Sequence, residues 1–306
     1  PDAPRRFDLE PISAGHRFPM GLALDRDGEL FVTDNQGNYK PFNELNHVRP
    51  GAHFGFINAL DRGKPASPRT PPAIDIPHPW TRSVNGVCFL YTPKELRTKL
   101  GHDVFGSLEG HLIGCEYDTR RLIRMTLQRV GDTFQGAAYP LSIPPSDPQR
   151  GFLGPLVCAV SPRGELYVGS IRDSGWGAGN NVGEIVRVRV QPDKLPCGLA
   201  EMRATPDGFI LDFFRPIDRK LAVKAESYAL QSYRREPTPA YGGPDLDRRT
   251  EKVIGVKVAS DGRRATLKLA EMRPGFVYEL RLKNLAPGGG DFHPAEAHYT
   301  LRVVPK

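Results

Sequence analysis

The polar segment Asp34-Asn35-Gln36-Gly37-Asn38 carries residue types from which binding sites are built. It directly follows an apolar stretch, where a strand should end, and loops at strand ends are where β scaffolds usually carry their chemistry. Arg17 lies upstream, at the start of the same stretch. Together they are a candidate ligand or ion site. The alternative is a polar turn beside which Arg17 forms a surface salt bridge, which contributes little to stability.

A second candidate lies at the end of the proline-rich residues 58–80. His78 stands between two prolines and is closely followed by Trp80. We expect these two side chains to line the substrate-facing surface of the fold. The alternative is a purely structural role, because single histidines are more often held by a backbone hydrogen bond than by a ligand.

Short strands must position these residues. Residues 20–25 form an apolar strand, Asp27-Gly28 is a hairpin turn signal, and residues 29–33 alternate polar and apolar residues as a half-buried strand does. The same signature returns at residues 157–169 and, more loosely, within residues 87–127. Units of about 45 residues fit between these copies, which is the spacing of four-stranded propeller blades.

The stretches between these copies are less regular. Residues 5–13 are expected to form one short strand without a partner, and residues 58–80 a long ordered connection. Only residues 93–100 have a helical pattern, with proline at the first position.

Composition restricts the class of protein. The chain has 306 residues, 39% of them apolar and 25% charged, which is enough for about two globular domains. Glycine (32) and proline (30) are spread as turn residues, which favours an all-β protein. No apolar run approaches the roughly 18 residues of a membrane helix, so no membrane-spanning segment is expected.

Charge and cysteine content exclude two further classes. The net charge of +7 comes from scattered arginines and not from a dense basic run, so no nucleic-acid partner is expected. The four cysteines form no Cys-x-x-Cys pair, which argues against zinc and covalent haem attachment. Cys88, Cys115 and Cys158 each lie inside an apolar strand, so we interpret these three as buried free thiols. The alternative is a disulfide among them, which depends on their positions in three dimensions.

Two domains are predicted. Residues 1–195 have the pattern of a partial β-propeller of about three to four blades. Residues 196–306 contain seven predicted strands separated by turn signals, which indicates an immunoglobulin-like β-sandwich.

The first 190 residues resemble the six-bladed propeller of the soluble quinoprotein glucose and aldose-sugar dehydrogenases. That family shows R-N-P-x-G-L, an acidic-Gly-Pro loop ending in D-E-x-N, P-G-x-x-Y-G-W, and a later P-S-G-L-x-F-Y strand. The corresponding segments here, in the same order, are RFPMGL at 17–22, DNQGN at 34–38, NELN at 43–46, PGAHFGF at 50–56 and SVNGV at 83–87. The similarity is closest to the branch that adds an immunoglobulin-like module and often a cytochrome or haem-binding tail.

The resemblance implies pyrroloquinoline quinone and calcium as cofactors. The first Arg of the family motif contacts the quinone, so Arg17 would bind a cofactor carboxylate, a task that suits its two-pronged guanidinium. The family's calcium-binding carbonyls map to Gly37 and Asn38, and Asp34 or Glu44 would add a hard oxygen ligand.

Several of the family's residues are replaced. The Asn beside the first Arg is Phe18, and the family's Lys falls near Asp118-Thr119. The R-Y-R-D segment is replaced by residues 154–157, with only Arg150 nearby. The catalytic His, which takes the proton of the sugar hydroxyl, would lie upstream of Pro1, so no catalytic residue is assigned.

Two functions are therefore open. The chain is the C-terminal part of a quinoprotein that oxidises a sugar or alcohol, is periplasmic or secreted, and passes electrons to a cytochrome or haem domain. Alternatively, it is a non-catalytic propeller that has lost its cofactor and binds carbohydrate or a protein.

Overall fold

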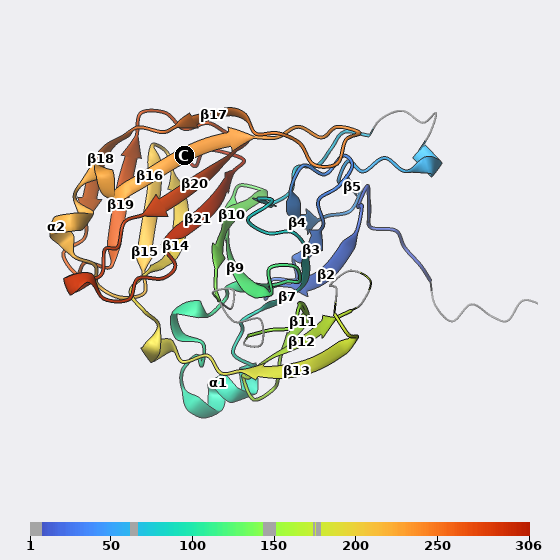
Figure 1. The fold of residues 1–306 in the computed structure, drawn as a ribbon, viewed down its shortest axis with the longest axis horizontal. Coiled ribbons are helices and arrows are strands. Elements are labelled where there is room, and N and C mark those ends of the chain that lie inside the picture. The colour runs from blue at the N-terminus through green and yellow to red at the C-terminus, as the bar shows by residue number, and fades with distance from the viewer. Residues whose placement is uncertain (1–7, 62–66, 143–150, 174, 176–178) are drawn as a thin grey trace, which may run out of the picture.

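The computed structural model describes residues 8–61, 67–142, 151–173, 175 and 179–306, and its regular structure is nearly all β-strand. The strands form several open sheets, as the sequence predicted for an all-β chain (Figure 1). No helix in these described ranges is both long and apolar enough to cross a membrane.

The first sheet contains the predicted hairpin. Its four antiparallel strands, in spatial order, are β2 (Pro19–Leu24), β3 (Leu30–Asp34), β4 (Asn43–Val48) and β6 (Ile74–Ile76). The hairpin loop spans residues 25–29, and Gly28 takes a φ of +85°, a conformation that glycine adopts without strain. Residues 58–80, expected to be only a connection, supply the fourth strand, whose Ile74 and Ile76 are fully buried.

The second sheet joins strands from distant parts of the chain. Its order is β17-β16-β20-β21-β10-β9-β8-β7. The bounds are β7 (Val84–Phe89), β8 (Leu112–Glu116), β9 (Arg121–Val130), β10 (Thr133–Pro140), β16 (Tyr228–Arg234), β17 (Leu246–Thr250), β20 (Phe276–Leu282) and β21 (Glu296–Leu301). The pairing of β10 with β21, with Ala137 opposite Tyr299, carries the sheet across residue 195. β9, between β10 and β8, is therefore an interior strand of this sheet.

Two further sheets and several small elements complete the fold. One sheet has the order β11 (Pro155–Val160), β12 (Leu166–Arg172), β13 (Val182–Val188), and the other β14 (Leu199–Thr205), β15 (Gly208–Phe213), β19 (Arg264–Leu269), β18 (Val253–Val258). A parallel pair joins β1 (Ser13–Ala14) to β5 (Ala52–His53). The α-helices are α1 (Lys94–Leu100) and α2 (Arg219–Ala222), and 3-10 turns span Ala59–Asp61, Gly106–Leu108, Pro192–Lys194, Ala225–Ser227 and Pro287–Gly289.

Two local predictions were wrong. Residues 8–12 are not a strand, and β1 begins only at Ser13; residues 5–7 lie outside the described residues. Pro93 is the N-cap of α1 and not its first helical residue.

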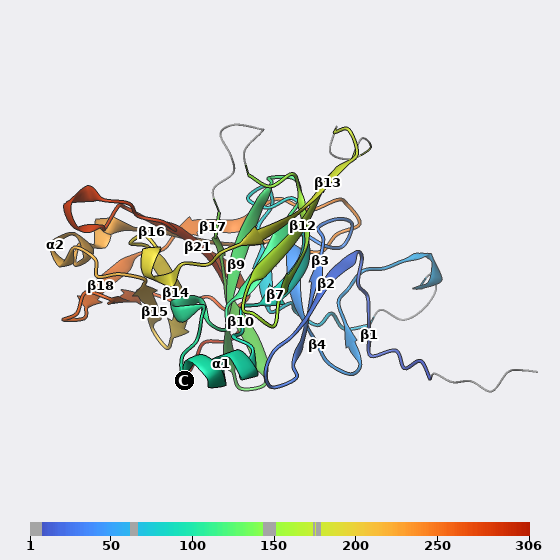
Figure 2. The same ribbon diagram turned by 90° about the horizontal axis from the view of Figure 1, so that it is seen from below.

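The sheets of the N-terminal part pack face to face, as propeller blades do. One apolar cluster lies between the β2–β6 sheet and the β7–β10 strands and includes Phe31, Ile74 and Met125. Another, with Ile113 and Val168, lies between the β7–β10 strands and the β11–β13 sheet. β7 is thus flanked by β2 and β11, an arrangement consistent with a β-propeller-like fold (Figure 2).

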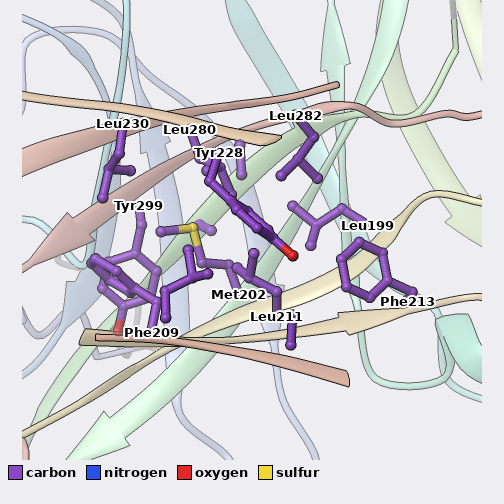
Figure 3. Packing of buried hydrophobic residues seen from close by; sticks show 14 of the residues in the cluster. Leu199, Met202, Phe209, Leu211, Phe213, Tyr228, Leu230, Leu280, Leu282 and Tyr299 are labelled. Atoms are coloured by element: carbon purple, nitrogen blue, oxygen red, sulfur yellow. The ribbon is translucent and has the colours of Figure 1, made fainter. Parts of the chain in front are cut away.

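The largest core lies between the β14–β15–β19–β18 sheet and the β16–β20–β21 strands. Figure 3 shows Phe209, Met202 and Leu280 pointing toward one another within it. Each such side chain contributes about 1.5–3 kcal/mol when fully buried. Tyr139 of β10 also belongs to this cluster, so the core is continuous with the long sheet.

Candidate functional site

A cavity of about 410 Å³ lies at one end of the inner strands β2, β7 and β11. This volume is within the range of small-molecule sites. Its lining comes from the first residues of β2, β7 and β11 and the residues just before β2 and β7, from the end of β12 and the residues just after β3, β8 and β12, and from the β16–β17 loop. The lining residues are Arg17, Phe18, Met20, Asn35, Gln36, Arg82, Ser83, Asn85, Tyr117, Leu156, Ile171, Asp173 and Tyr241.

Arg17 is placed at this cavity by the carboxylate of Asp34. Asp34 ends β3 and is fully buried, and its side-chain oxygens accept the backbone N–H groups of Arg17 (3.0 Å) and Phe18 (2.6 Å). Hydrogen bonds to an ionised acceptor are stronger than neutral ones. The start of β2 is therefore fixed to the end of β3, with the Arg17 side chain at the cavity.

Arg82 is placed in the same way by the next sheet. Glu116 ends β8 and is fully buried, and its Oε1 accepts the backbone N–H groups of Arg82 and Ser83, both at 2.8 Å. Two arginines thus meet one cavity through equivalent anchors in neighbouring sheets.

The cavity also contains an unused hydrogen-bond acceptor. Asn35 is buried, its Nδ2 donates to Ser83 Oγ (3.2 Å), and its Oδ1 has no partner among the described residues. Buried polar atoms are rarely left without a partner in folded proteins. Asn35 therefore places a polar amide in the cavity wall, with its oxygen not engaged by the described residues.

Two aromatic rings border the cavity. The Tyr117 hydroxyl donates to Asp173 Oδ2 (2.7 Å), and burial together with this carboxylate raises the pKa of Tyr117, so the phenol is neutral at physiological pH. The Arg17 guanidinium lies 5.4 Å from the ring centre of Tyr241, within the range of a cation–π contact.

Tyr241 belongs to the β16–β17 loop, which extends from the C-terminal strands across to the segment that follows β3 (Figure 1). Three hydrogen bonds join the two segments: Tyr39 N–H to Thr238 O, Asn38 Nδ2 to Pro239 O, and Gly242 N–H to Gly37 O. A segment about two hundred residues away in sequence thus forms part of the cavity wall.

Of the predicted cofactor-binding residues, two lie at the cavity and the side chain of the third is directed to the β16–β17 loop. Arg17 lines the cavity, and Gly37 lies directly against it, since a Cβ at residue 37 would fall 1.9 Å from Arg17 Nε. The Gly37 carbonyl already accepts the N–H groups of Lys40 and Gly242. Asn38 is exposed, and its side chain is directed to Pro239.

The two predicted metal ligands do lie together, but they share a cation from the protein itself. Lys40 Nζ lies 3.1 Å from Asp34 Oδ2 and 2.7 Å from Glu44 Oε2, and all three side chains are fully buried. Glu44 Oε1 also accepts from Arg69 (2.8 Å). With these oxygens and the Gly37 carbonyl already bound, the residues present do not fit calcium at this position. In the described part of the chain, no group of three or more His, Cys, Asp or Glu residues is arranged to hold a metal.

His78 and Trp80 lie away from this cavity. They line a separate crevice of about 320 Å³ beside Tyr233, Arg235 and His298. Trp80 Nε1 donates to Glu296 (2.9 Å), which joins the start of the second sheet to β21.

The sequence did not single out Arg82, Tyr117 or Tyr241. A local signal existed for Arg82, since Arg-Ser directly precedes the 84–89 strand as Arg-Phe precedes the 19–24 strand. Tyr241 had no such signal, because only the folded chain brings its loop to the cavity. The four cysteines, three of which were expected to be buried, are all free thiols, with Cys115 and Cys197 buried and Cys88 and Cys158 partly buried.

Comparison with known proteins gives structural neighbours only. No family model and no curated protein matches the chain. The oxidoreductase (glucose dehydrogenase) of Thermus thermophilus is 22% identical, over 57% of this chain and 46% of that one, with a TM-score of 0.39. The aldose sugar dehydrogenase of Streptomyces coelicolor, solved with bound PQQ, is 22% identical over 62% and 49%, with a TM-score of 0.39.

The soluble aldose sugar dehydrogenase of Escherichia coli, in its apo form, is 18% identical over 59% and 47%, with a TM-score of 0.38. The chain spans about half the length of these proteins. They are of the class that the sequence motifs resemble, but similarity at this level assigns neither an activity nor a cofactor to this chain.

Proposed function

We propose that the cavity binds pyrroloquinoline quinone or a similar flat polycarboxylate, as part of a quinoprotein that oxidises a sugar or alcohol. The observation that carries this proposal is the presence of Arg17 and Arg82 at one cavity, each anchored by a buried carboxylate. Two arginines whose backbone is fixed in this way bring two guanidinium groups to one cavity, which suits two carboxylates of one ligand.

The other lining residues fit the same kind of ligand. Tyr241 is exposed and offers an aromatic surface to a planar ring system, and Tyr117 and Asn35 form part of the cavity wall. Gly37 leaves room for the Arg17 guanidinium, and Asn38 ties the loop in place. A bound quinone would supply the two-electron oxidation, while the residues of this chain bind and orient it. No catalytic base is assigned within the chain.

The wider context is part of the same proposal. The cavity would belong to a partial propeller of three to four blades over residues 1–195, followed by an immunoglobulin-like sandwich over residues 196–306. A sugar or alcohol would be the substrate, a cytochrome or haem domain the electron acceptor, and the periplasm or the exterior the location. His78 and Trp80 are left out, because their crevice is separate from the cavity.

The test is a titration of the purified chain with pyrroloquinoline quinone, in which quinone absorbance and protein fluorescence report binding. Arg17→Ala and Arg82→Ala should each weaken binding by about 10- to 100-fold, the usual range for a charged hydrogen bond. Arg163→Ala, at an exposed arginine outside the cavity, is the control and should bind normally. Wild-type protein that binds no quinone, or binding unchanged in both variants, would contradict the proposal.

A non-catalytic carbohydrate-binding function is the second candidate. Its support is the neutral part of the lining, in which Asn35, Ser83 and Asn85 offer donors and acceptors for hydroxyl groups beside the two tyrosines. Calorimetric binding of a neutral sugar without quinone, weakened by Asn35→Ala and not by Arg82→Ala, would favour this candidate over the first.

A further inference from the structure

Lys40 has three oxygen atoms as close neighbours in a site closed to solvent. Its Nζ lies 2.6 Å from Phe54 O, 2.7 Å from Glu44 Oε2 and 3.1 Å from Asp34 Oδ2. The Lys40 side chain is fully buried. An ammonium group has three N–H donors. Two of them bind Glu44 Oε2 and Phe54 O, and Asp34 Oδ2 lies at ion-pair distance.

The charges around Lys40 are balanced without any added ion. The two carboxylates of Asp34 and Glu44 face the two cations of Lys40 and Arg69. Burial raises the pKa of Glu44, and the charges of Lys40 and Arg69 oppose this shift. His16, whose Nδ1 lies 3.8 Å from Asp34 Oδ2, has its pKa lowered by burial, which favours its neutral form. A divalent cation placed here would meet an ammonium group a few ångströms away and would have no net negative charge to bind.

Lys40 is also linked to the cavity through Asp34. The same carboxylate that binds the ammonium accepts the backbone N–H groups of Arg17 and Phe18. Lys40 therefore fixes the Asp34 carboxylate, and Asp34 in turn holds the segment that presents the Arg17 guanidinium.

We propose that the Lys40 ammonium is a built-in replacement for a divalent metal ion, and that it makes the Arg17 side of the cavity independent of metal. Lys40 is a positioning residue, since it acts through Asp34 and does not line the cavity. This goes beyond the proposed function, because it holds whichever ligand the cavity takes.

A specific consequence follows for substitutions of Lys40. Lys40→Ala removes the ammonium and leaves two carboxylates and one carbonyl around an empty volume, which are the hard oxygen ligands that calcium prefers. The variant should gain a calcium site, with water completing the coordination shell. Lys40→Met fills much of the same volume with an apolar chain and should not gain one.

The experiment measures thermal unfolding with excess EDTA and with millimolar calcium, and needs no quinone. The unfolding midpoint of the wild type should be the same in both. Lys40→Ala should unfold roughly ten degrees lower in EDTA, because a buried ion pair is broken, and calcium should recover several degrees of this loss. Lys40→Met should be destabilised without recovery, and Lys94→Ala, at an exposed lysine, should behave as the wild type.

Calcium binding by the wild-type protein tests the proposal even if the variants fail to fold. Calorimetric titration of metal-free wild type with calcium should show no binding. Stoichiometric calcium binding that is lost in Asp34→Asn would overturn the proposal, and so would a Lys40→Ala variant that folds and shows no response to calcium. Failure of quinone binding would contradict the proposed function and leave this result unaffected.

Discussion

Asp34 and Glu116 occupy equivalent positions in neighbouring sheets, and each binds the two backbone N–H groups that precede the first strand of its own sheet. Asp34 ends β3 and holds Arg17 and Phe18, and Glu116 ends β8 and holds Arg82 and Ser83. Both carboxylates are fully buried. The repeated contact fixes two arginines at one cavity, and the predictions below follow from it and from the neighbouring contacts.

Replacing Glu116 with Ala should destabilise the protein by about 2–4 kcal/mol, because it removes the charged acceptor of the backbone N–H groups of Arg82, Ser83 and Thr119. Urea unfolding measures the change. Glu226→Ala, at an exposed glutamate, is the control and should change stability by less than about 0.5 kcal/mol. Quinone affinity should fall as well, because Glu116 no longer holds the backbone of Arg82. If the stability of Glu116→Ala is unchanged, the contact between Glu116 and this backbone is dispensable.

Gly37→Ala should displace the Arg17 guanidinium, because the new Cβ would lie 1.9 Å from Arg17 Nε. We expect binding of an anionic ligand to weaken about as much as in Arg17→Ala, while the chain stays folded. Quinone titration and circular dichroism measure the two effects. Gly183→Ala is the matched control, since its nearest neighbour would lie 3.7 Å away.

Tyr241→Ala should weaken ligand binding, although residue 241 lies in the C-terminal part of the chain. The substitution removes an aromatic wall and the cation–π contact with Arg17, a contribution of about 0.5–2 kcal/mol, or roughly 2- to 30-fold in affinity. Tyr241→Phe keeps the ring and should bind almost as the wild type. Equal affinities for all three proteins would remove Tyr241 from the site.

Stability should decrease as the pH falls from about 6.5 to about 4, partly through His298. Burial lowers the pKa of His298 to about 4, and the neighbouring Glu279, Glu296, Arg281 and Arg121 only modify this effect. Between pH 6.5 and 4 the unfolded state therefore binds a proton at His298 more readily than the folded state does, and falling pH favours unfolding. The contribution of His298 to the free energy of unfolding is fully present above pH 6.5 and is lost toward pH 4.

The expected loss from this one group is about 3 kcal/mol, because each tenfold difference in proton affinity between the folded and unfolded states contributes about 1.4 kcal/mol. Urea unfolding at a series of pH values measures it. His298→Phe should flatten the curve between about pH 4 and 6.5, and His102→Phe, at an exposed histidine, should leave it unchanged. A His298→Phe curve parallel to that of the wild type would show that another group causes the loss.

Local patterns predicted those parts of the fold that depend on residues close together in the sequence. Alternation of polar and apolar residues identified the 19–34 hairpin and the strands at 155–172, because side-chain direction in a strand has a period of two. The same reasoning missed β6 and β17, which are short and proline-bounded or charged. These strands form because a neighbouring strand, β4 or β16, offers unpaired backbone groups.

Local periodicity and turn residues were sufficient to specify the all-β class, the hairpins and a polar segment at the end of a strand. They also placed Arg17 and Asp34 in one candidate site, to which the family resemblance added Glu44. The folded chain was needed to show that Lys40 binds both carboxylates, that Arg82 joins Arg17, and that Tyr241 completes the cavity wall. Ion pairing and cavity lining depend on distances between segments far apart in the chain, and those distances are set by how the sheets pack.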